Sequence, residues 1–147
     1  MNRWIRRSLV GVLGLVGIGA AGLALGNWLG DRKATRHVEV AVAAVPIPVD
    51  ADSLRRGHYL YATRGCAECH GSDGAGKAFI DDGGLYAKAP DITRGGVVAA
   101  YRDVDWVRTI RHGVKPGGQP VFIMPSEDYS RLTDADLGAL VGYVQAL

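Results

Sequence analysis

The sequence predicts an all-α protein in which one transmembrane helix precedes a small helical domain with long loops. Residues 9–29 contain no charged side chain, and three segments within residues 52–147 repeat apolar side chains every three or four positions. The first pattern is typical of a membrane span and the second of amphipathic helices. A length of 147 residues suits one ordinary domain with an appendage.

The N-terminal segment, residues 1–30, is expected to be a membrane anchor. Arg3, Arg6 and Arg7 precede the uncharged stretch, which as a helix rising about 1.5 Å per residue crosses a hydrocarbon core of about 30 Å. Basic flanks stay in the cytoplasm, so the domain is predicted to lie in the periplasm, held at the cytoplasmic membrane by a single pass. The alternative is a cleaved signal peptide, whose apolar region is usually only about 7–15 residues long.

Residues 31–51 are expected to form a tether. Pro46 and Pro48 prevent a continuous helix, because proline lacks an N–H and biases the preceding residue towards an extended conformation. An extended tether would let the domain, residues 52–147, swing between partners.

The two halves of the chain differ in charge. The first 49 residues hold six basic and two acidic side chains, whereas the remainder holds eleven basic and thirteen acidic ones. The globular part therefore lacks the basic surplus that binding to phosphates requires. Nucleic acid is excluded as a partner.

Residues 53–64, 104–112 and 134–147 are expected to be the three helices of the domain. Each follows a residue suited to cap a helix N-terminus: Asp52, Asp103 and Thr133. The first two stop at glycines, Gly65 and Gly113. Residues 71–102 are rich in Gly and Asp without a sustained period, so we expect a long loop, which needs a large bound group to organise it.

The sequence Cys66-Ala67-Glu68-Cys69-His70 carries the chemistry. C-x-x-C-H is the motif for covalent haem attachment, in which two sulfurs add to the vinyl groups and the imidazole binds the iron. With only two cysteines in the chain, a four-cysteine zinc site is excluded. A thioredoxin-like redox pair is the alternative, but it requires a βαβ pattern that the sequence lacks. We therefore predict one covalent haem c on Cys66 and Cys69, with His70 as an iron ligand.

Met124 is predicted to be the second axial ligand. It is the only methionine of the domain and stands before Pro125, in a segment with no helical pattern. A lone methionine can also serve as core filler, but a proline-flanked loop is an unusual place for one. The competing ligands are the remaining histidines: His37, His58 and His112.

The glycine-rich stretch after the motif imitates a phosphate-binding loop. Residues 71–77 fit its first seven positions, but Ala78 stands where Ser or Thr must bind magnesium. The stretch also follows the haem motif instead of a strand. We therefore predict no nucleotide site and interpret these glycines as a turn.

Together these motifs resemble a class I monohaem cytochrome c of the membrane-anchored bacterial type. Residues 56–60, 66–70, 106–114 and 124–137 are similar to haem domains in cytochrome subunits of membrane-bound alcohol and gluconate dehydrogenases. The resemblance implies N- and C-terminal helices that cross beside the haem, with Gly57 near Tyr143. It also implies that the Pro90 carbonyl orients the imidazole of His70.

The expected function is electron transfer and not enzymatic catalysis. An iron bound by both His70 and Met124 has no open position, and a thioether favours the ferrous state. The predicted partners are transient: a dehydrogenase or quinol-oxidising complex as donor and a terminal oxidase as acceptor. Two rivals stay open, namely a haem enzyme or ligand sensor in which Met124 dissociates, and an anchored dithiol protein without haem.

Overall fold

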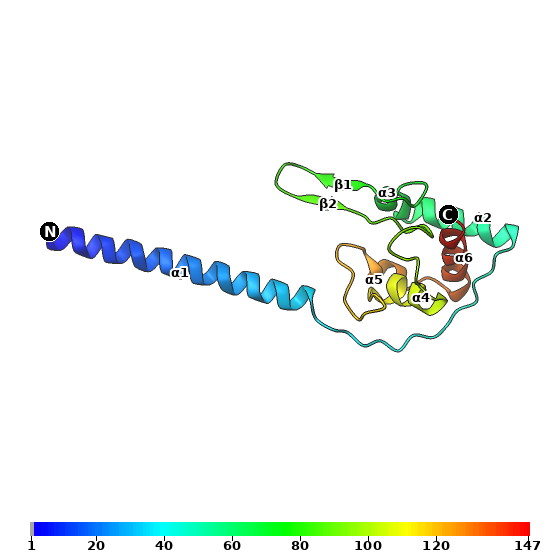
Figure 1. Ribbon diagram of the computed structural model, residues 1–147, viewed down its shortest axis with the longest axis horizontal. Coiled ribbons are helices and arrows are strands. Elements are labelled where there is room, and N and C mark those ends of the chain that lie inside the picture. The colour runs from blue at the N-terminus through cyan, green and yellow to red at the C-terminus, as the bar shows by residue number, and fades with distance from the viewer. Residues whose placement is uncertain (1) are drawn as a thin grey trace. The chain divides into compact units, whose positions relative to one another are not determined.

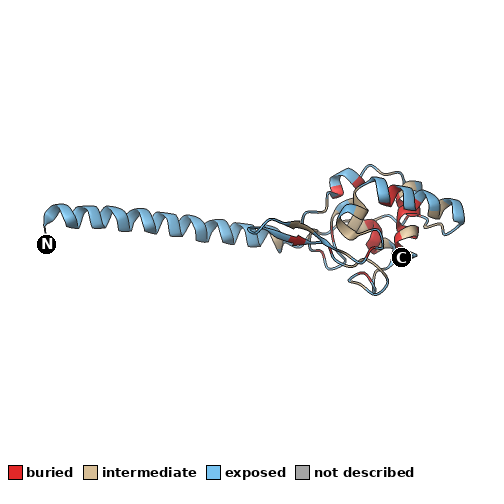
Figure 2. Cartoon of the chain, turned by 90° about the horizontal axis from the view of Figure 1, so that it is seen from above, coloured by how far each residue is buried: buried red, intermediate tan, exposed pale blue. Residues whose placement is uncertain are grey.

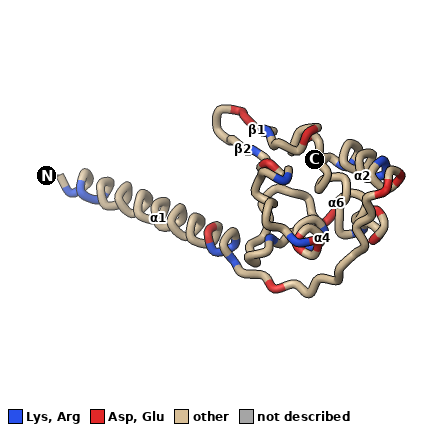
Figure 3. The backbone as a smooth tube through the Cα atoms, turned by 45° about the vertical axis from the view of Figure 1, so that its right-hand side comes forward, with Lys and Arg blue, Asp and Glu red and all other residues tan. Residues whose placement is uncertain are grey.

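The computed structural model describes residues 2–147 and separates into two compact units, of which the second is Val38–Leu147. The first unit consists mainly of helix α1, Arg3–Ala34 (Figure 1). No residue of α1 is buried, as Figure 2 shows, and its length and composition suffice to cross a membrane. Its charged residues lie near its two ends, and its middle contains none (Figure 3).

The second unit is built on the crossing of two helices, α2 (Ala51–Thr63) and α6 (Asp134–Gln145). Gly57 sits at the crossing: a β-carbon there would lie 2.1 Å from the carbonyl oxygen of Ala139 and 2.6 Å from the β-carbon of Tyr143. Only glycine lets the two backbones approach this closely. The contact implied at Gly57 by the resemblance is therefore present.

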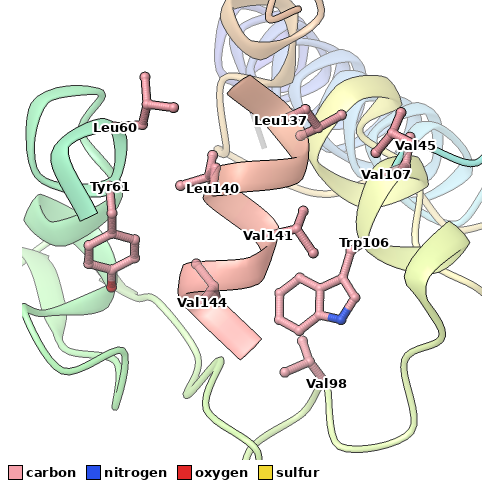
Figure 4. Packing of buried hydrophobic residues seen from close by; sticks show 10 residues of the cluster. All are labelled: Val45, Leu60, Tyr61, Val98, Trp106, Val107, Leu137, Leu140, Val141 and Val144. Atoms are coloured by element: carbon pink, nitrogen blue, oxygen red, sulfur yellow. The ribbon is translucent and has the colours of Figure 1, made fainter. Parts of the chain in front are cut away.

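Helix α6 forms the centre of the hydrophobic core and is buried on two sides. Figure 4 shows Leu60 and Tyr61 of α2 on one side of it, and Trp106 and Val107 of α4 (Asp103–His112) on the other. The stripe predicted on the last helix supplies the contacts: Leu137, Leu140, Val141 and Val144. This burial explains why the last helix could be predicted from its pattern alone.

Residues 38–50 do not form the free tether expected from the sequence. Val45 is only 7% exposed and belongs to the core. The segment packs closely against two glycines of α6. A β-carbon at Gly138 would lie 2.0 Å from the carbonyl oxygen of Pro46, and one at Gly142 would lie 2.5 Å from that of Pro48. The extended conformation that the prolines impose therefore allows this segment to pack on α6. Only residues 35–37 lie between the end of α1 and the start of the second unit.

The predicted loop 71–102 contains a hairpin that the all-α prediction missed. Strand β1 (Ala78–Asp81) pairs antiparallel with β2 (Tyr86–Lys88). The turn is made by Asp82, whose carboxylate accepts hydrogen bonds from the N–H groups of Gly84 (3.3 Å) and Leu85 (2.9 Å). Asp82 is followed by two glycines, and an Asp with glycines between short apolar runs is a local turn signal.

Helix starts differ from the predictions in detail. The cap of α2 is Asp50 and not Asp52, because the Asp50 carboxylate accepts from two backbone N–H groups, at 3.1 Å and 3.0 Å. Thr133 caps α6 as predicted, accepting from Asp136 N at 3.1 Å. The Asp136 carboxylate accepts a hydrogen bond from Arg56 Nε at 2.8 Å, which links α6 to α2.

Candidate haem attachment site

The attachment motif forms a helix of its own, α3 (Cys66–His70), directly after α2. Gly65 precedes it with φ of 85°, a left-handed conformation that glycine adopts without strain. Cys66 and Cys69 are three residues apart and Cys66 and His70 four, so their side chains share one face of the turn. Both thiols are free and half-buried.

The imidazole of His70 is held by a backbone carbonyl. Its Nδ1 lies 2.9 Å from the carbonyl oxygen of Pro90. Because a carbonyl oxygen only accepts, Nδ1 must be the donor, and in the neutral ring this tautomer leaves a lone pair on Nε2. A histidine in this state is prepared to bind a metal through Nε2.

Pro90 reaches His70 because the glycine-rich turn lets two loops touch. Gly76 has φ of 78°, and a β-carbon there would lie 2.4 Å from the carbonyl oxygen of Ala89. Its N–H donates to the carbonyl of His70 at 2.8 Å. The turn predicted after the motif is thus present, and Gly76 also brings the Pro90 segment against α3, a role that sequence reasoning missed.

Two buried tyrosines fasten the ends of α3, and neither was predicted as a site residue. The hydroxyl of Tyr61 donates to the carbonyl of Gly71 at 2.6 Å, after the helix, and that of Tyr129 donates to the carbonyl of Arg64 at 2.9 Å, before it. Burial raises the pKa of both hydroxyls, so both keep their protons at neutral pH. No local pattern marks either bond, and the partner of Tyr129 lies 65 positions away.

The Cys66 thiol is not tuned for redox exchange. Burial raises its pKa to about 11. A reactive thiol of the thioredoxin type needs a lowered pKa, since the thiolate is the nucleophile. The environment of Cys66 therefore weighs against the redox-pair alternative.

Met124 lies on a separate segment, between α4 and the short helix α5 (Ser126–Tyr129). It is half-buried, and its carbonyl accepts from Ser126 N at 2.9 Å. The residue before it, Ile123, has φ of 73°, which is rare for a β-branched residue and costs free energy. Strain of this kind clusters at ligand sites, but the role of Met124 as a ligand stays a prediction.

The residues present fit haem c. Two free thiols and an imidazole with a free Nε2 share one helical turn, which is the donor set that covalent haem requires. Large apolar side chains are exposed on the hairpin and beside Met124: Leu85, Tyr86, Phe122 and Ile123. Such exposed apolar surface is suited to contact with a macrocycle.

Comparison with known proteins shows the family. Residues 52–144 match the family described as Cytochrome C oxidase, cbb3-type, subunit III. The chain belongs to this family of cytochrome c domains. The cytochrome accordingly carries covalently bound haem c, and the matched domain is an electron-transfer domain.

The cytochrome is similar to subunits of larger enzymes. It is 35% identical over 111 residues to the fructose dehydrogenase cytochrome subunit of Gluconobacter japonicus, covering 67% of this chain and 22% of that protein. It is 31% identical over 100 residues to the gluconate 2-dehydrogenase cytochrome c subunit of Pantoea cypripedii, covering 61% and 22%. The Cbb3-type cytochrome c oxidase subunit CcoP of Helicobacter pylori (strain 52) is 28% identical over 118 residues, covering 80% and 36%. The cytochrome thus spans about a fifth to a third of the length of these relatives.

Proposed function

We propose that this cytochrome passes single electrons between respiratory partners at the cytoplasmic membrane, with its iron bound by His70 and Met124. The observation that carries the proposal is the hydrogen bond from His70 Nδ1 to the Pro90 carbonyl, beside two free thiols on the same turn. Together they offer two attachment points and one oriented metal ligand.

The class I arrangement is part of this proposal. The crossing of α2 and α6, closed by Gly57, and the placement of α3 directly after α2 support it. A rigid crossing next to the attachment turn fixes the backbone that carries both cysteines.

Each residue of the site has a separate role. Haem c, when bound, supplies one-electron chemistry between ferric and ferrous iron. Cys66 and Cys69 hold it covalently, and the Pro90 carbonyl keeps the His70 ring oriented and makes it a stronger donor. The soft sulfur of Met124 would be the second protein ligand to the iron and would favour the ferrous state. A site closed on both sides exchanges electrons and leaves no position for substrate.

The membrane location and the partners are proposed from different observations. Helix α1 is long and apolar enough to span, with Arg3, Arg6 and Arg7 before it, so we propose an anchor within residues 1–30 and the domain on the periplasmic side. The relatives are named as subunits of dehydrogenases and of an oxidase. We therefore place a dehydrogenase or quinol-oxidising complex as donor and a terminal oxidase as acceptor.

Replacing Met124 by alanine tests the ligation. The variant should lose the iron–sulfur charge-transfer band of the ferric spectrum and bind carbon monoxide rapidly when reduced, whereas the wild type binds it poorly. The His58→Ala and His112→Ala variants are the controls, because both side chains are exposed on helices. If Met124→Ala kept the wild-type spectrum, or if the wild type bound carbon monoxide stoichiometrically at neutral pH, the proposed closed site would be wrong.

A further inference from the structure

We infer that Tyr129 is a positioning residue that fixes the Met124 segment to the haem attachment turn and thereby keeps the sulfur on the iron. The inference rests on the proposed ligation by Met124 and adds a residue that neither the motif nor the family match assigns.

The hydroxyl of Tyr129 bridges two distant segments. It donates to the carbonyl of Arg64 at 2.9 Å, although the two residues are 65 positions apart. Arg64 stands two residues before Cys66, and a β-carbon at Gly65 would lie 3.9 Å from the same hydroxyl. The Tyr129 side chain is only 8% exposed, so its hydroxyl reaches the start of α3 from within the protein.

Tyr129 and Met124 belong to one hydrogen-bonded turn. The N–H of Ser126 donates to the carbonyl of Met124 at 2.9 Å, and the N–H of Asp128 donates to that of Pro125 at 3.1 Å. The N–H of Ser130 then donates to the carbonyl of Ser126 at 2.9 Å. A displacement at Tyr129 is therefore transmitted to the Met124 backbone.

The other attachments of this segment lead to α4 and not to the haem turn. The N–H of Val121 donates to the carbonyl of Gly113 at 2.8 Å, and a β-carbon at Gly113 would lie 2.9 Å from Ser126 Oγ. Within residues 2–147, Tyr129 is the one residue of the range 120–130 whose side chain hydrogen-bonds to residues 51–70. It is the direct polar link between the two segments that carry the proposed axial ligands.

The link matters because a neutral thioether is a weak ligand. The fraction of molecules in which the thioether is bound depends on how firmly the protein holds it near the metal. A pre-positioned group competes far better with external ligands than a mobile one. A buried hydroxyl without a partner is unfavourable, so the Tyr129 bond resists separation of the two segments. Loss of the hydroxyl should let the sulfur leave the iron more often.

The test is a titration of the full-length ferric holocytochrome with imidazole, which displaces the sulfur. Tyr129→Phe keeps the ring and removes the donor, so it should bind imidazole on the order of threefold to tenfold more tightly, as expected for one net hydrogen bond, and should show a lower reduction potential. Tyr101→Phe is the matched control: its hydroxyl contacts Thr109 Oγ1 at 3.5 Å and its ring packs on Trp106, within or beside α4. Its imidazole affinity should equal that of the wild type.

A ring-fluorinated tyrosine at position 129 serves if Tyr129→Phe fails to fold with haem. Fluorine makes the hydroxyl a stronger donor, so imidazole binding should weaken. An imidazole affinity that stays at the wild-type value in whichever of these variants folds, even with a lower melting temperature, would overturn the inference. Failure of the proposed ligation looks different, because Met124→Ala would then leave the visible spectrum of the wild type unchanged.

Discussion

Replacing Gly57 by alanine is expected to destabilise the domain by forcing α2 away from α6. The added β-carbon would lie 2.1 Å from the Ala139 carbonyl oxygen and 2.6 Å from the Tyr143 β-carbon, whereas real β-carbon contacts start at 3.0 Å. The distance to the Ala139 oxygen is therefore about 0.9 Å too short. This oxygen belongs to the backbone, so it cannot move away by a side-chain rotation. The two helices must therefore separate or tilt.

The expected change in the free energy of unfolding is the sum of two opposing contributions. Overpacking a tight contact costs about 1–3 kcal/mol, while alanine in a helix gains about 1 kcal/mol over glycine. Because the clash is with backbone, we take the upper end of the cost, which leaves a net loss of about 2 kcal/mol. For a unit of this size, that lowers the melting temperature by roughly 10 °C.

The assay is thermal unfolding of the full-length holocytochrome followed by circular dichroism. The control is Gly84→Ala, in the hairpin turn, where a β-carbon would meet nothing within 4 Å. Its melting temperature should stay close to that of the wild type. If Gly57→Ala melted at or above the wild-type temperature, the close crossing of α2 and α6 would be wrong.

Three further substitutions test other contacts. Gly138→Ala places a β-carbon 2.0 Å from the Pro46 carbonyl oxygen, so limited proteolysis should cut residues 38–50 faster than in wild type; equal rates would show that this segment does not rest on α6. Asp105→Asn alters a buried carboxylate in the first turn of α4 that accepts hydrogen bonds from the backbone N–H and the guanidinium of Arg102, and this hydrogen bonding keeps the carboxyl pKa below its usual value. The stabilisation by Asp105 is present above about pH 4 and is lost as the pH falls below it, so the wild-type melting temperature should drop more steeply there than that of Asp105→Asn, and parallel curves would contradict this. Thr133→Ala removes the cap of α6 and should lower the free energy of unfolding by about 1 kcal/mol in a urea titration; an unchanged midpoint would refute the cap.

The features predicted from sequence were those with local signals. The stripe on α6 and its Thr133 cap follow from spacing within a few residues, and the attachment motif is itself contiguous. The start of α2 was misplaced because Asp50 and Asp52 both suit a cap, and only geometry shows which carboxylate reaches two N–H groups. Local patterns therefore gave the helices but not every boundary.

The features that were missed depend on contacts between distant residues. The packing of Pro46 on Gly138 joins positions far apart in the chain, and no periodicity in either segment reveals it. The bond from Tyr129 to Arg64 is equally invisible locally. The pairing of Pro90 with His70 could be anticipated only through the family resemblance, since their spacing alone predicts nothing.

The central claim is that the motif carries one covalent haem, and intact mass spectrometry of the exported chain under denaturing conditions tests it most directly. The account predicts a polypeptide heavier by one haem, with both cysteines blocked to alkylation, and a Cys66→Ala, Cys69→Ala double variant without that addition. A chain at its bare polypeptide mass, with two alkylatable thiols and all colour extracted by acid acetone, would contradict it.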